Sequence, residues 1–367
     1  MKIGILGAGQ LGRMLALAGL PLGFEFIFLD PAADACAAAL GDHLRADYAD
    51  PAALARFCAH AKLVTYEFEN VPVSIAERIA GGLPLYPGIP ALRTSQDRLA
   101  EKQMFTQLGI DVPLYHRVDS RAELSAAAAH TGLPAVLKTR RMGYDGKGQI
   151  VLHDEHSLDQ AWTQLGGQPL ILEAFVPFKR ELSCLAVRSR DGSVRFYPVV
   201  ENQHLDGILR VSRPRLDDPL QVKAQDYSTR VLKRLDYVGV LAVEFFDLGG
   251  RLLANEFAPR VHNSGHWSIE GAVCSQFENH LRAISGLPLG ETRSREPSAM
   301  INCIGRMPTL SQIAALPHTH LHDYGKPAKP LRKLGHITVL AEDDKTLEAR
   351  IKTIQALTPT EPARKQD

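Results

Sequence analysis

A glycine-rich turn follows a short apolar run at the start of this 367-residue chain. Residues 2–6 read KIGIL, the turn GAGQLG occupies residues 7–12, and a helical pattern comes next. Two further apolar runs, 24–29 and 63–66, end at Asp30 and Glu67. Short strands that alternate with Ala-rich helical segments predict a parallel α/β sheet. We therefore expect an α/β unit that closes near Pro84–Pro90.

The turn has the GxGxxG spacing of a dinucleotide site, and Asp30 ends the next strand as a ribose-binding acid does. One interpretation is an NAD site, with the helix N-terminus facing a pyrophosphate. The alternative is a tight turn whose glycines allow close helix–strand packing. The motif alone leaves a dehydrogenase open. The rest of the chain favours the second interpretation, because it carries a denser and different nucleotide site.

Length and charge exclude several classes of protein. A chain of 367 residues predicts two or three domains. Lys and Arg total 42 against 41 Asp and Glu, so no general attraction to nucleic acid or to an anionic membrane is expected. No apolar stretch reaches the ~18 residues of a membrane span, and no signal peptide is visible. Five scattered cysteines predict neither a disulfide framework nor a zinc site, so we expect a cytoplasmic location.

A second glycine-rich segment predicts a phosphate site. Lys138 ends an apolar strand, and Gly143-Tyr144-Asp145-Gly146-Lys147-Gly148-Gln149 follows. Three glycines let backbone N–H groups approach anionic oxygens, and the two lysines add positive charge. The alternative is a hairpin with solvated lysines. The GxxxxGK[ST] pattern is absent, so this is not a P-loop.

A strand end downstream fits the base and sugar of a nucleotide. Glu173-Ala174-Phe175-Val176 ends an apolar strand, and Glu181 opens the next one. Backbone groups of such a segment can bind an adenine edge, and a nearby carboxylate can bind ribose hydroxyls. A charged pair on a strand edge is the commoner case.

Two carboxylates within apolar strands give the strongest signal. Glu244 lies in VLAVEFF (240–246), and Asn255-Glu256 interrupts LLANEF (252–257). Buried carboxylates are unfavourable unless they are paired or metal-bound. If the strands form a hairpin, Glu244 and Glu256 converge on one face with Asn255, and such oxygen ligands suit Mg²⁺. The alternative is a pair of strand ends that face water.

A polar segment follows this hairpin at once. Residues 258–267 read APRVHNSGHW and are rich in hydrogen-bond donors. A lone histidine would more often be structural. Arg260, His262 and Asn263 beside two buried carboxylates instead predict a site for a small oxyanion next to the γ-phosphate.

Taken together, these segments resemble the ATP-grasp superfamily and, within it, the N5-carboxyaminoimidazole ribonucleotide synthetase family. The matching stretches run in order along nearly the whole chain: GAGQLGRM (7–14), TYEFENVP (65–72), QDRL (96–99), KTRRMGYDGKGQ (138–149), EAFVPFKREL (173–182), VVENQHLDGIL (199–209), NEFAPRVHNSGHW (255–267) and RKLGH (332–336). No single stretch is decisive, but the ordered set is specific. Met142 and Leu331 stand where this family usually has glycine, which affects the conformation of two loops rather than the chemistry.

The resemblance implies a fold in three parts. An N-terminal Rossmann-like domain (1–94) that does not bind NAD would precede an ATP-grasp domain of two subdomains (95–290). A small β-rich C-terminal domain (291–357) and a disordered tail (358–367) would follow. It also implies a homodimer.

The resemblance further implies ATP-dependent carboxylation of 5-aminoimidazole ribonucleotide by bicarbonate in purine biosynthesis, with Mg²⁺. Arg98, Lys138 and residues 143–149 would hold the ATP phosphates, Glu173–Val176 the adenine, Glu181 the ribose, and His204 would also lie at the nucleotide. Glu244 and Glu256 would bind Mg²⁺, with Asn255 beside them. Arg260, His262 and Asn263 would hold bicarbonate and then carboxyphosphate, with Asp145 and Lys147 in the catalytic set. Tyr144, Asp145, Lys147, Lys326, Arg332 and Lys333 would bind the ribonucleotide.

Three alternatives remain open from the sequence. A second ATP-grasp ligase, the formate-dependent glycinamide ribonucleotide transformylase, would share the fold and the ATP site. An NAD-dependent oxidoreductase depends on residues 7–30 alone. A non-catalytic nucleotide sensor would be expected to lack one of Glu244, Glu256 or Lys138, and all three are present.

Overall fold

The computed structural model describes residues 1–143 and 147–358, so Tyr144, Asp145 and Gly146 and the tail from residue 359 lie outside the described part. The chain begins with a four-stranded parallel sheet of order β3-β2-β1-β4, as expected. Its elements are β1 (Lys2–Leu6), α1 (Gln10–Gly19), η1 (Leu20–Leu22), β2 (Glu25–Leu29), η2 (Ala38–Leu40), β3 (Asp42–Leu44), α2 (Pro51–His60), β4 (Leu63–Tyr66) and α3 (Val73–Ala80).

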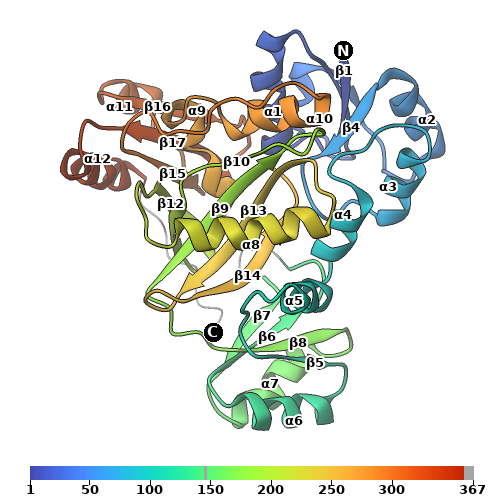
Figure 1. The fold of residues 1–367 in the computed structure, drawn as a ribbon, viewed down its shortest axis with the longest axis vertical. Helices are drawn as coiled ribbons and strands as arrows, with labels where there is room; N and C mark the ends of the chain where they lie inside the picture. Colours follow the sequence, from blue (N-terminus) through green and yellow to red (C-terminus); the bar gives the residue numbers. More distant parts are fainter. Residues whose placement is uncertain (144–146, 359–367) are drawn as a thin grey trace.

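Two consecutive helices, α4 (Ile89–Ser95) and α5 (Arg98–Gln107), lead out of this unit. Helix α5 begins at Arg98. The reason is Asp97, whose carboxylate accepts the N–H of Leu99 at 3.0 Å and caps α5. Figure 1 shows α5 between the large central sheet and the small sheet below it.

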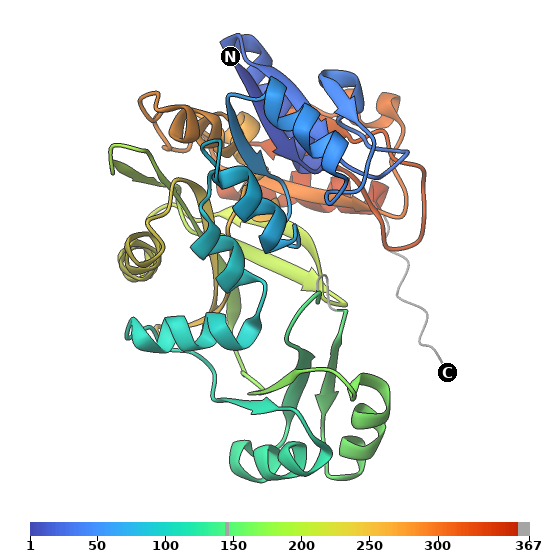
Figure 2. The same cartoon turned by 90° about the vertical axis from the view of Figure 1, so that its right-hand side faces the viewer.

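A small antiparallel sheet of order β5-β8-β6-β7 forms the first subdomain of the central region. Its elements are β5 (Tyr115–Val118), α6 (Arg121–Thr131), β6 (Ala135–Thr139), β7 (Gln149–Leu152), α7 (His156–Leu165) and β8 (Leu170–Ala174). Leu124 of α6 and Leu158 of α7 pack against Leu137 and Leu172 of the strands. Both helices lie on the outer side of this lobe in Figures 1 and 2. The second glycine-rich segment joins β6 to β7, whose strands pair from Ala135↔Leu152 to Lys138↔Gln149.

A nine-stranded antiparallel sheet forms the body of the molecule, in the order β14-β13-β9-β11-β12-β15-β17-β16, with β10 paired to β9. Its strands are β9 (Arg180–Arg188), β10 (Val194–Phe196), β11 (Val200–Leu205), β12 (Ile208–Pro214), β13 (Gly239–Asp247), β14 (Leu252–Ala258), β15 (Ser298–Ile304), β16 (Thr319–Asp323) and β17 (Lys333–Leu340). The helices among them are α8 (Gln221–Arg234), η3 (Asn263–Gly265), α9 (Ser268–Gly271), α10 (Gln276–Ser285), α11 (Leu310–Ala314) and α12 (Asp344–Leu357). Strands β10 and β11 are separated around Pro198, which has no N–H to donate to a sheet.

The last part of the chain extends this sheet rather than forming a separate one. Strand β15 pairs with β12 through Val211↔Ile301 and Ser212↔Met300. The irregular stretch 286–297 therefore lies between two parts of the chain that belong to the same sheet. The boundary between residues 290 and 291 stays a prediction. Within the described residues, no helix is both long and apolar enough to span a membrane.

Candidate active site

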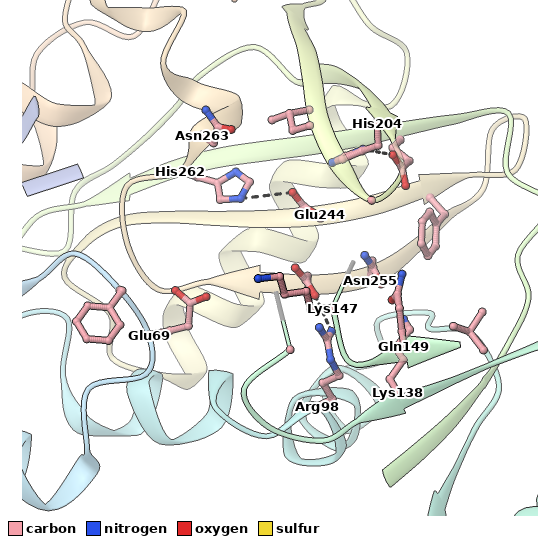
Figure 3. Close-up of a pocket in the computed structure, with 18 of the residues that line it drawn as sticks. Glu69, Arg98, Lys138, Lys147, Gln149, His204, Glu244, Asn255, His262 and Asn263 are labelled. Atoms are coloured by element: carbon pink, nitrogen blue, oxygen red, sulfur yellow. Dashed lines mark hydrogen bonds and ion pairs between the residues drawn. The ribbon is translucent and has the colours of Figure 1, made fainter. Parts of the chain in front are cut away.

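A cavity of about 630 Å³ lies where the three parts of the chain meet. Most of the residues that the sequence analysis selects line it: Arg98, Lys138, Gly143, Lys147, Gln149, Glu173, Ala174, Phe175, Val176, Glu181, His204, Glu244, Asn255, Glu256, Arg260, His262, Asn263 and Lys333. Figure 3 shows ten of the lining residues labelled, with side chains from both sheets converging on the cavity. Gly148, Lys326 and Arg332 are not among the lining residues. Tyr144, Asp145 and Gly146 lie outside the described part of the chain.

The two acidic residues face each other across one hairpin. Glu244 of β13 is in register with Glu256 of β14, and the register shifts immediately afterwards, so that Phe245 pairs with Ala254. Asn255 is therefore the extra residue of a β-bulge, and a bulge changes the direction of a side chain. This explains how two consecutive residues, Asn255 and Glu256, both line the cavity.

Electrostatics distinguish the two carboxylates. Arg98 Nη1 lies 2.6 Å from Glu256 Oε2. Burial alone would raise the pKa of Glu256, but Arg98, followed by Lys138 and Lys102, lowers it to about 2. Burial, followed by the charge of Glu256, raises the pKa of Glu244 to about 7. Two carboxylates in register thus repel one another, and a cation between them would relieve that repulsion.

The donor set fits Mg²⁺ carried by a nucleotide. Two carboxylates are present, and Asn255 Oδ1 is buried without a hydrogen-bond partner. No cluster of three or more His, Cys, Asp or Glu ligands occurs among the described residues. Magnesium is commonly held by one or two carboxylates together with substrate phosphates, so a complete protein cage is not required.

A buried ionic cluster supports the phosphate side of the cavity. Glu173 Oε2 lies 3.0 Å from Lys138 Nζ and 3.4 Å from Lys102 Nζ. Burial raises the pKa of Glu173, but Lys102, Lys138 and Arg98 together lower it to about 2, so this carboxylate is charged. Lys102 is 1% exposed and was not selected from the sequence.

His262 of the polar segment is uncharged. Burial, reinforced by the charge of Arg260, lowers the pKa of His262 to about 3. Its Nδ1 accepts the N–H of Ser264, so the ring proton is on Nε2, which lies 3.5 Å from Glu244 Oε1. The two groups face one another in Figure 3. His262 therefore presents a neutral N–H donor to the cavity.

Other buried side chains fix this segment. Gln276 accepts the N–H of His262 at 2.9 Å and donates to its C=O at 2.7 Å. Asn263 and Asn302 of β15 exchange two amide hydrogen bonds, at 3.1 and 2.7 Å. Arg260 donates to both carboxylate oxygens of Glu69, one of them at 3.1 Å.

The nucleoside side of the cavity combines an ion pair with aromatic rings. His204 Nδ1 is hydrogen-bonded to Glu181 Oε2. Burial would lower the pKa of His204, but Glu181 and Glu244 raise it. Phe178 and Phe246 stack with centroids 4.9 Å apart, and both line the cavity. An apolar slot next to a carboxylate suits a base with its ribose.

The three cations expected at the ribonucleotide lie at the junction of the last and first parts of the chain. Lys333 lines the cavity. Lys326 Nζ is hydrogen-bonded to the side chain of Gln10, which itself lines the cavity. Arg332 Nη2 lies 3.0 Å from Asp34 Oδ2.

Side chains of the protein itself occupy the anion-binding position of the first glycine motif. Glu67 accepts the N–H of Gly9 and, at 2.7 Å, the N–H of Gly12. Asp30 accepts the N–H of Ala8 at 2.8 Å. A Cβ at Gly7 would lie 2.4 Å from Glu67 Cγ. The glycines thus make room for a carboxylate of the chain at the place where an NAD pyrophosphate would lie.

Sequence reasoning missed Glu69, Lys102, Gln276 and Asn302. Glu69 lies inside TYEFENVP, which was matched without a role being assigned to it. The other three occupy ordinary helix or strand positions. Their contacts join residues that are 14 to 153 positions apart, so only the tertiary structure shows them.

Comparison with known proteins matches three consecutive parts of the chain to family models. Residues 1–96 match the ribonucleotide synthetase preATP-grasp domain, residues 103–277 the ATP-grasp domain, and residues 298–350 the phosphoribosylaminoimidazole carboxylase C-terminal domain. N5-carboxyaminoimidazole ribonucleotide synthase of Pseudomonas aeruginosa is 57% identical over 357 residues, which cover 97% of this chain and 99% of that protein. This chain belongs to the N5-carboxyaminoimidazole ribonucleotide synthase family.

Solved structures of N5-carboxyaminoimidazole ribonucleotide synthases have the same fold. The synthetase of Thermus thermophilus superposes with a TM-score of 0.94 at 53% identity, covering 99% of this chain and 100% of that one. A structure from Aspergillus clavatus, in complex with ADP and 5-aminoimidazole ribonucleotide, gives a TM-score of 0.90 at 31% identity, covering 97% and 98%. The expected ATP-grasp fold with its two flanking domains is thereby confirmed.

Proposed function

We propose that this chain is an ATP-dependent ligase that carboxylates 5-aminoimidazole ribonucleotide. It uses bicarbonate and ATP, passes through carboxyphosphate, and releases N5-carboxyaminoimidazole ribonucleotide, ADP and phosphate in purine biosynthesis. The observation that carries the proposal is the convergence of two groups of residues in one cavity. Glu244 and Glu256 lie in register there, and Arg260, His262 and Asn263 stand beside them.

ATP occupies the side of the cavity that faces the small sheet. Arg98, Lys138, Lys147 and the N–H groups of the glycine-rich segment bind its phosphates. Backbone groups of residues 173–176 bind adenine beside Phe178 and Phe246, and Glu181 with His204 binds the ribose. Relatives solved in complex with ATP or ADP support the binding of ATP by this chain.

Magnesium is the second part of the nucleotide site. Glu244 and Glu256 would hold it, with Asn255 Oδ1 as a neighbouring oxygen donor. When bound, the ion would neutralise charge on the phosphoryl group in transfer. Glu244, whose pKa is raised to about 7 without a cation, would be ionised by it.

Bicarbonate binds between the γ-phosphate and the polar segment. Arg260 supplies positive charge. His262 Nε2–H and Asn263 supply neutral hydrogen-bond donors that orient the anion. A bicarbonate oxygen attacks the γ-phosphorus, a new P–O bond forms, and the bond to ADP breaks. Positioning and charge neutralisation are the main requirements of such a transfer.

The ribonucleotide binds toward the last domain. Its amine attacks the carboxyl carbon of carboxyphosphate, a C–N bond forms, phosphate leaves and one proton is lost. Lys326, Arg332 and Lys333 bind its phosphate. The roles predicted for Tyr144 and Asp145, including proton removal by Asp145, concern residues outside the described part and stay predictions.

One assay tests the function directly. We expect ADP release that depends on both bicarbonate and 5-aminoimidazole ribonucleotide and that requires Mg²⁺. Formate with glycinamide ribonucleotide is the control for the alternative ATP-grasp ligase. Two results would assign the chain to another reaction. One is turnover with formate and glycinamide ribonucleotide in the absence of bicarbonate; the other is ADP release that does not depend on 5-aminoimidazole ribonucleotide.

Assembly and location remain proposals. We infer a homodimer from the family resemblance. A cytoplasmic location is supported by five cysteines that are all unpaired. Analytical ultracentrifugation tests the first, and fractionation of cells tests the second.

A further inference from the structure

Strand β14, which carries Glu256, is the outermost strand of the large sheet, and its open edge is not left bare. In the strand order, β14 has a neighbour only on the β13 side. On the other side, the C=O of Asn255 accepts from Lys102 Nζ at 2.6 Å, and the N–H of Phe257 donates to Glu101 Oε1 at 2.6 Å. One residue lies between these two anchored groups, and that residue is Glu256.

Both anchors come from consecutive residues of α5. Glu101 and Lys102 are 2% and 1% exposed, so each of these ionisable side chains is held in a fixed environment. Burial, followed by the charge of Glu256, raises the pKa of Glu101 to about 8. Lys102 also lies 3.4 Å from Glu173 at the end of β8 in the small sheet. The same helix begins with Arg98, which is bonded to the Glu256 carboxylate. Helix α5 therefore contacts the backbone groups of the two residues that flank Glu256, the Glu256 side chain, and the opposite lobe.

We propose that Glu101 and Lys102 are positioning residues for phosphoryl transfer, which complete the edge of β14 and fix Glu256 relative to Glu173 and Lys138. Neither residue lines the 630 Å³ cavity, so each would act through the strand that it holds. A displacement of reacting groups by about 1 Å is able to lower a rate about a hundredfold. This inference depends on the proposed function, because the assigned role of Glu256 is part of it.

The test uses the full-length enzyme and four variants in the ADP-release assay. Lys102→Met removes the ammonium group but keeps most of the volume. Glu101→Leu removes the acceptor for Phe257, whereas Glu101→Gln keeps an acceptor oxygen. Arg188→Met is the matched control, since Arg188 also donates to a backbone carbonyl, that of Tyr237 at 2.7 Å, but does not line the cavity.

We expect kcat to fall about ten- to a hundredfold in Lys102→Met and Glu101→Leu, on the scale of a misplaced reacting group. Glu101→Gln should recover most of the loss seen in Glu101→Leu. The KM for 5-aminoimidazole ribonucleotide should stay within about twofold, and Arg188→Met should keep the wild-type kcat. Circular dichroism at the assay temperature identifies the folded variants; if Lys102→Met does not fold, the two Glu101 variants decide.

A double variant separates positioning from simple support of the fold. If Lys102 acts through Glu256, then Lys102→Met combined with Glu256→Gln should lose no more kcat than Glu256→Gln alone. Fully additive losses, a wild-type kcat in a folded Lys102→Met, or equal losses in Glu101→Gln and Glu101→Leu would each overturn the inference. Absence of turnover in the wild type would instead overturn the proposed function.

Discussion

At the scale of single residues, the site depends on a few groups whose charge is set by their neighbours. Arg98 lowers the pKa of Glu256, burial and then Glu256 raise the pKa of Glu244, and burial lowers the pKa of His262. The residue types could be selected from the sequence. Their charge states could not, because they depend on burial in the folded molecule and on partners such as Arg98, which is 158 positions from Glu256.

Replacement of Glu256 tests the most central of these groups. Glu256→Gln keeps the shape but removes a negative charge from the proposed metal site, so kcat should fall about 10²–10³-fold, as for loss of one electrostatic stabiliser. The fold should persist, because the amide can still accept from Arg98. Steady-state ADP release across a Mg²⁺ titration provides the measurement. Near-normal turnover with unchanged Mg²⁺ dependence would exclude the metal assignment.

A second buried histidine links stability to pH. His280 Nδ1 accepts the N–H of Val240 at 3.1 Å, so its Nε2–H donates to Thr65 at 2.9 Å. Burial lowers the pKa of His280 to about 3, whereas an unfolded histidine titrates near 6.5. Between these values the unfolded state binds more protons, so the free energy of unfolding decreases as pH falls below about 6.5.

The expected contribution of His280 is roughly 1.4 kcal/mol per pH unit between about pH 6 and pH 4. Urea unfolding of the wild type and of His280→Gln at pH 7, 6 and 5 measures it. The variant should be less stable at pH 7 and should have the shallower pH dependence. Parallel curves for the two proteins would contradict a neutral His280 in the folded state.

At the scale of elements, two loops contain residues in a conformation that favours glycine. Met142 has φ of 63° and Leu331 has φ of 59°. Met142 precedes the glycine-rich segment, and Leu331 precedes Arg332. These are the two positions at which the sequence analysis expects a glycine in related proteins, and the positive φ of both residues agrees with that expectation. A left-handed conformation costs a residue with a Cβ roughly 1–2 kcal/mol.

Substitutions at Leu331 should show this strain. Leu331→Gly removes the steric cost. It also gives the unfolded chain more conformational freedom, which lowers the free energy of unfolding by about 0.5–1 kcal/mol. We expect an unchanged or slightly raised Tm for Leu331→Gly and a clearly lowered Tm for Leu331→Val, since β-branched residues tolerate positive φ least. Thermal melts of the three proteins decide. The opposite order would show that contacts of the Leu331 side chain outweigh its backbone strain.

Elements also show what the sequence could and could not predict. The hairpin at residues 240–257 followed from two apolar runs around Gly249-Gly250, and β13 and β14 confirm it. The bulge at Asn255 could not be predicted, because the residue types in LLANEF do not show whether the strand contains an extra residue. The edge contacts of Glu101 and Lys102 were equally hidden, since α5 and β14 are about 150 residues apart.

At the scale of the whole molecule, the chain brings one site together from three parts. Arg332 belongs to the last part and pairs with the exposed Asp34 of the first, a contact that contributes little to stability. Arg332→Ala should therefore fold normally. A hydrogen bond to a charged group contributes about 1.5–3 kcal/mol, so the KM for 5-aminoimidazole ribonucleotide should rise roughly tenfold to a hundredfold.

The KM for ATP should change far less in Arg332→Ala, because the proposed site of the ATP phosphates is at Arg98 and Lys138. Kinetics with each substrate varied in turn measure both values. Equal effects on the two substrates, or none on either, would remove Arg332 from the ribonucleotide site.

Contacts between distant parts of the chain also predict which nucleotide binds, ATP or NAD. The N–H groups that would bind a dinucleotide phosphate are already bonded to Glu67, so calorimetric titration should give binding of ATP and none of NAD. Glu67→Ala should lower the free energy of unfolding by about 1–3 kcal/mol, because it leaves two N–H groups without their acceptor. Tight NAD binding by the wild type would restore the dehydrogenase interpretation.

The pairing of β12 with β15 has a practical consequence for anyone who shortens this protein. A chain that stops before residue 298 would lose β15, β16 and β17 and leave the backbone of β12 with a bare row of N–H and C=O groups. Such an edge recruits strands from other molecules. The ATP-grasp region on its own is thus a poor candidate for expression as a soluble fragment. Variants shortened at the C-terminal end should be examined for self-association before a loss of their activity is interpreted as a catalytic effect.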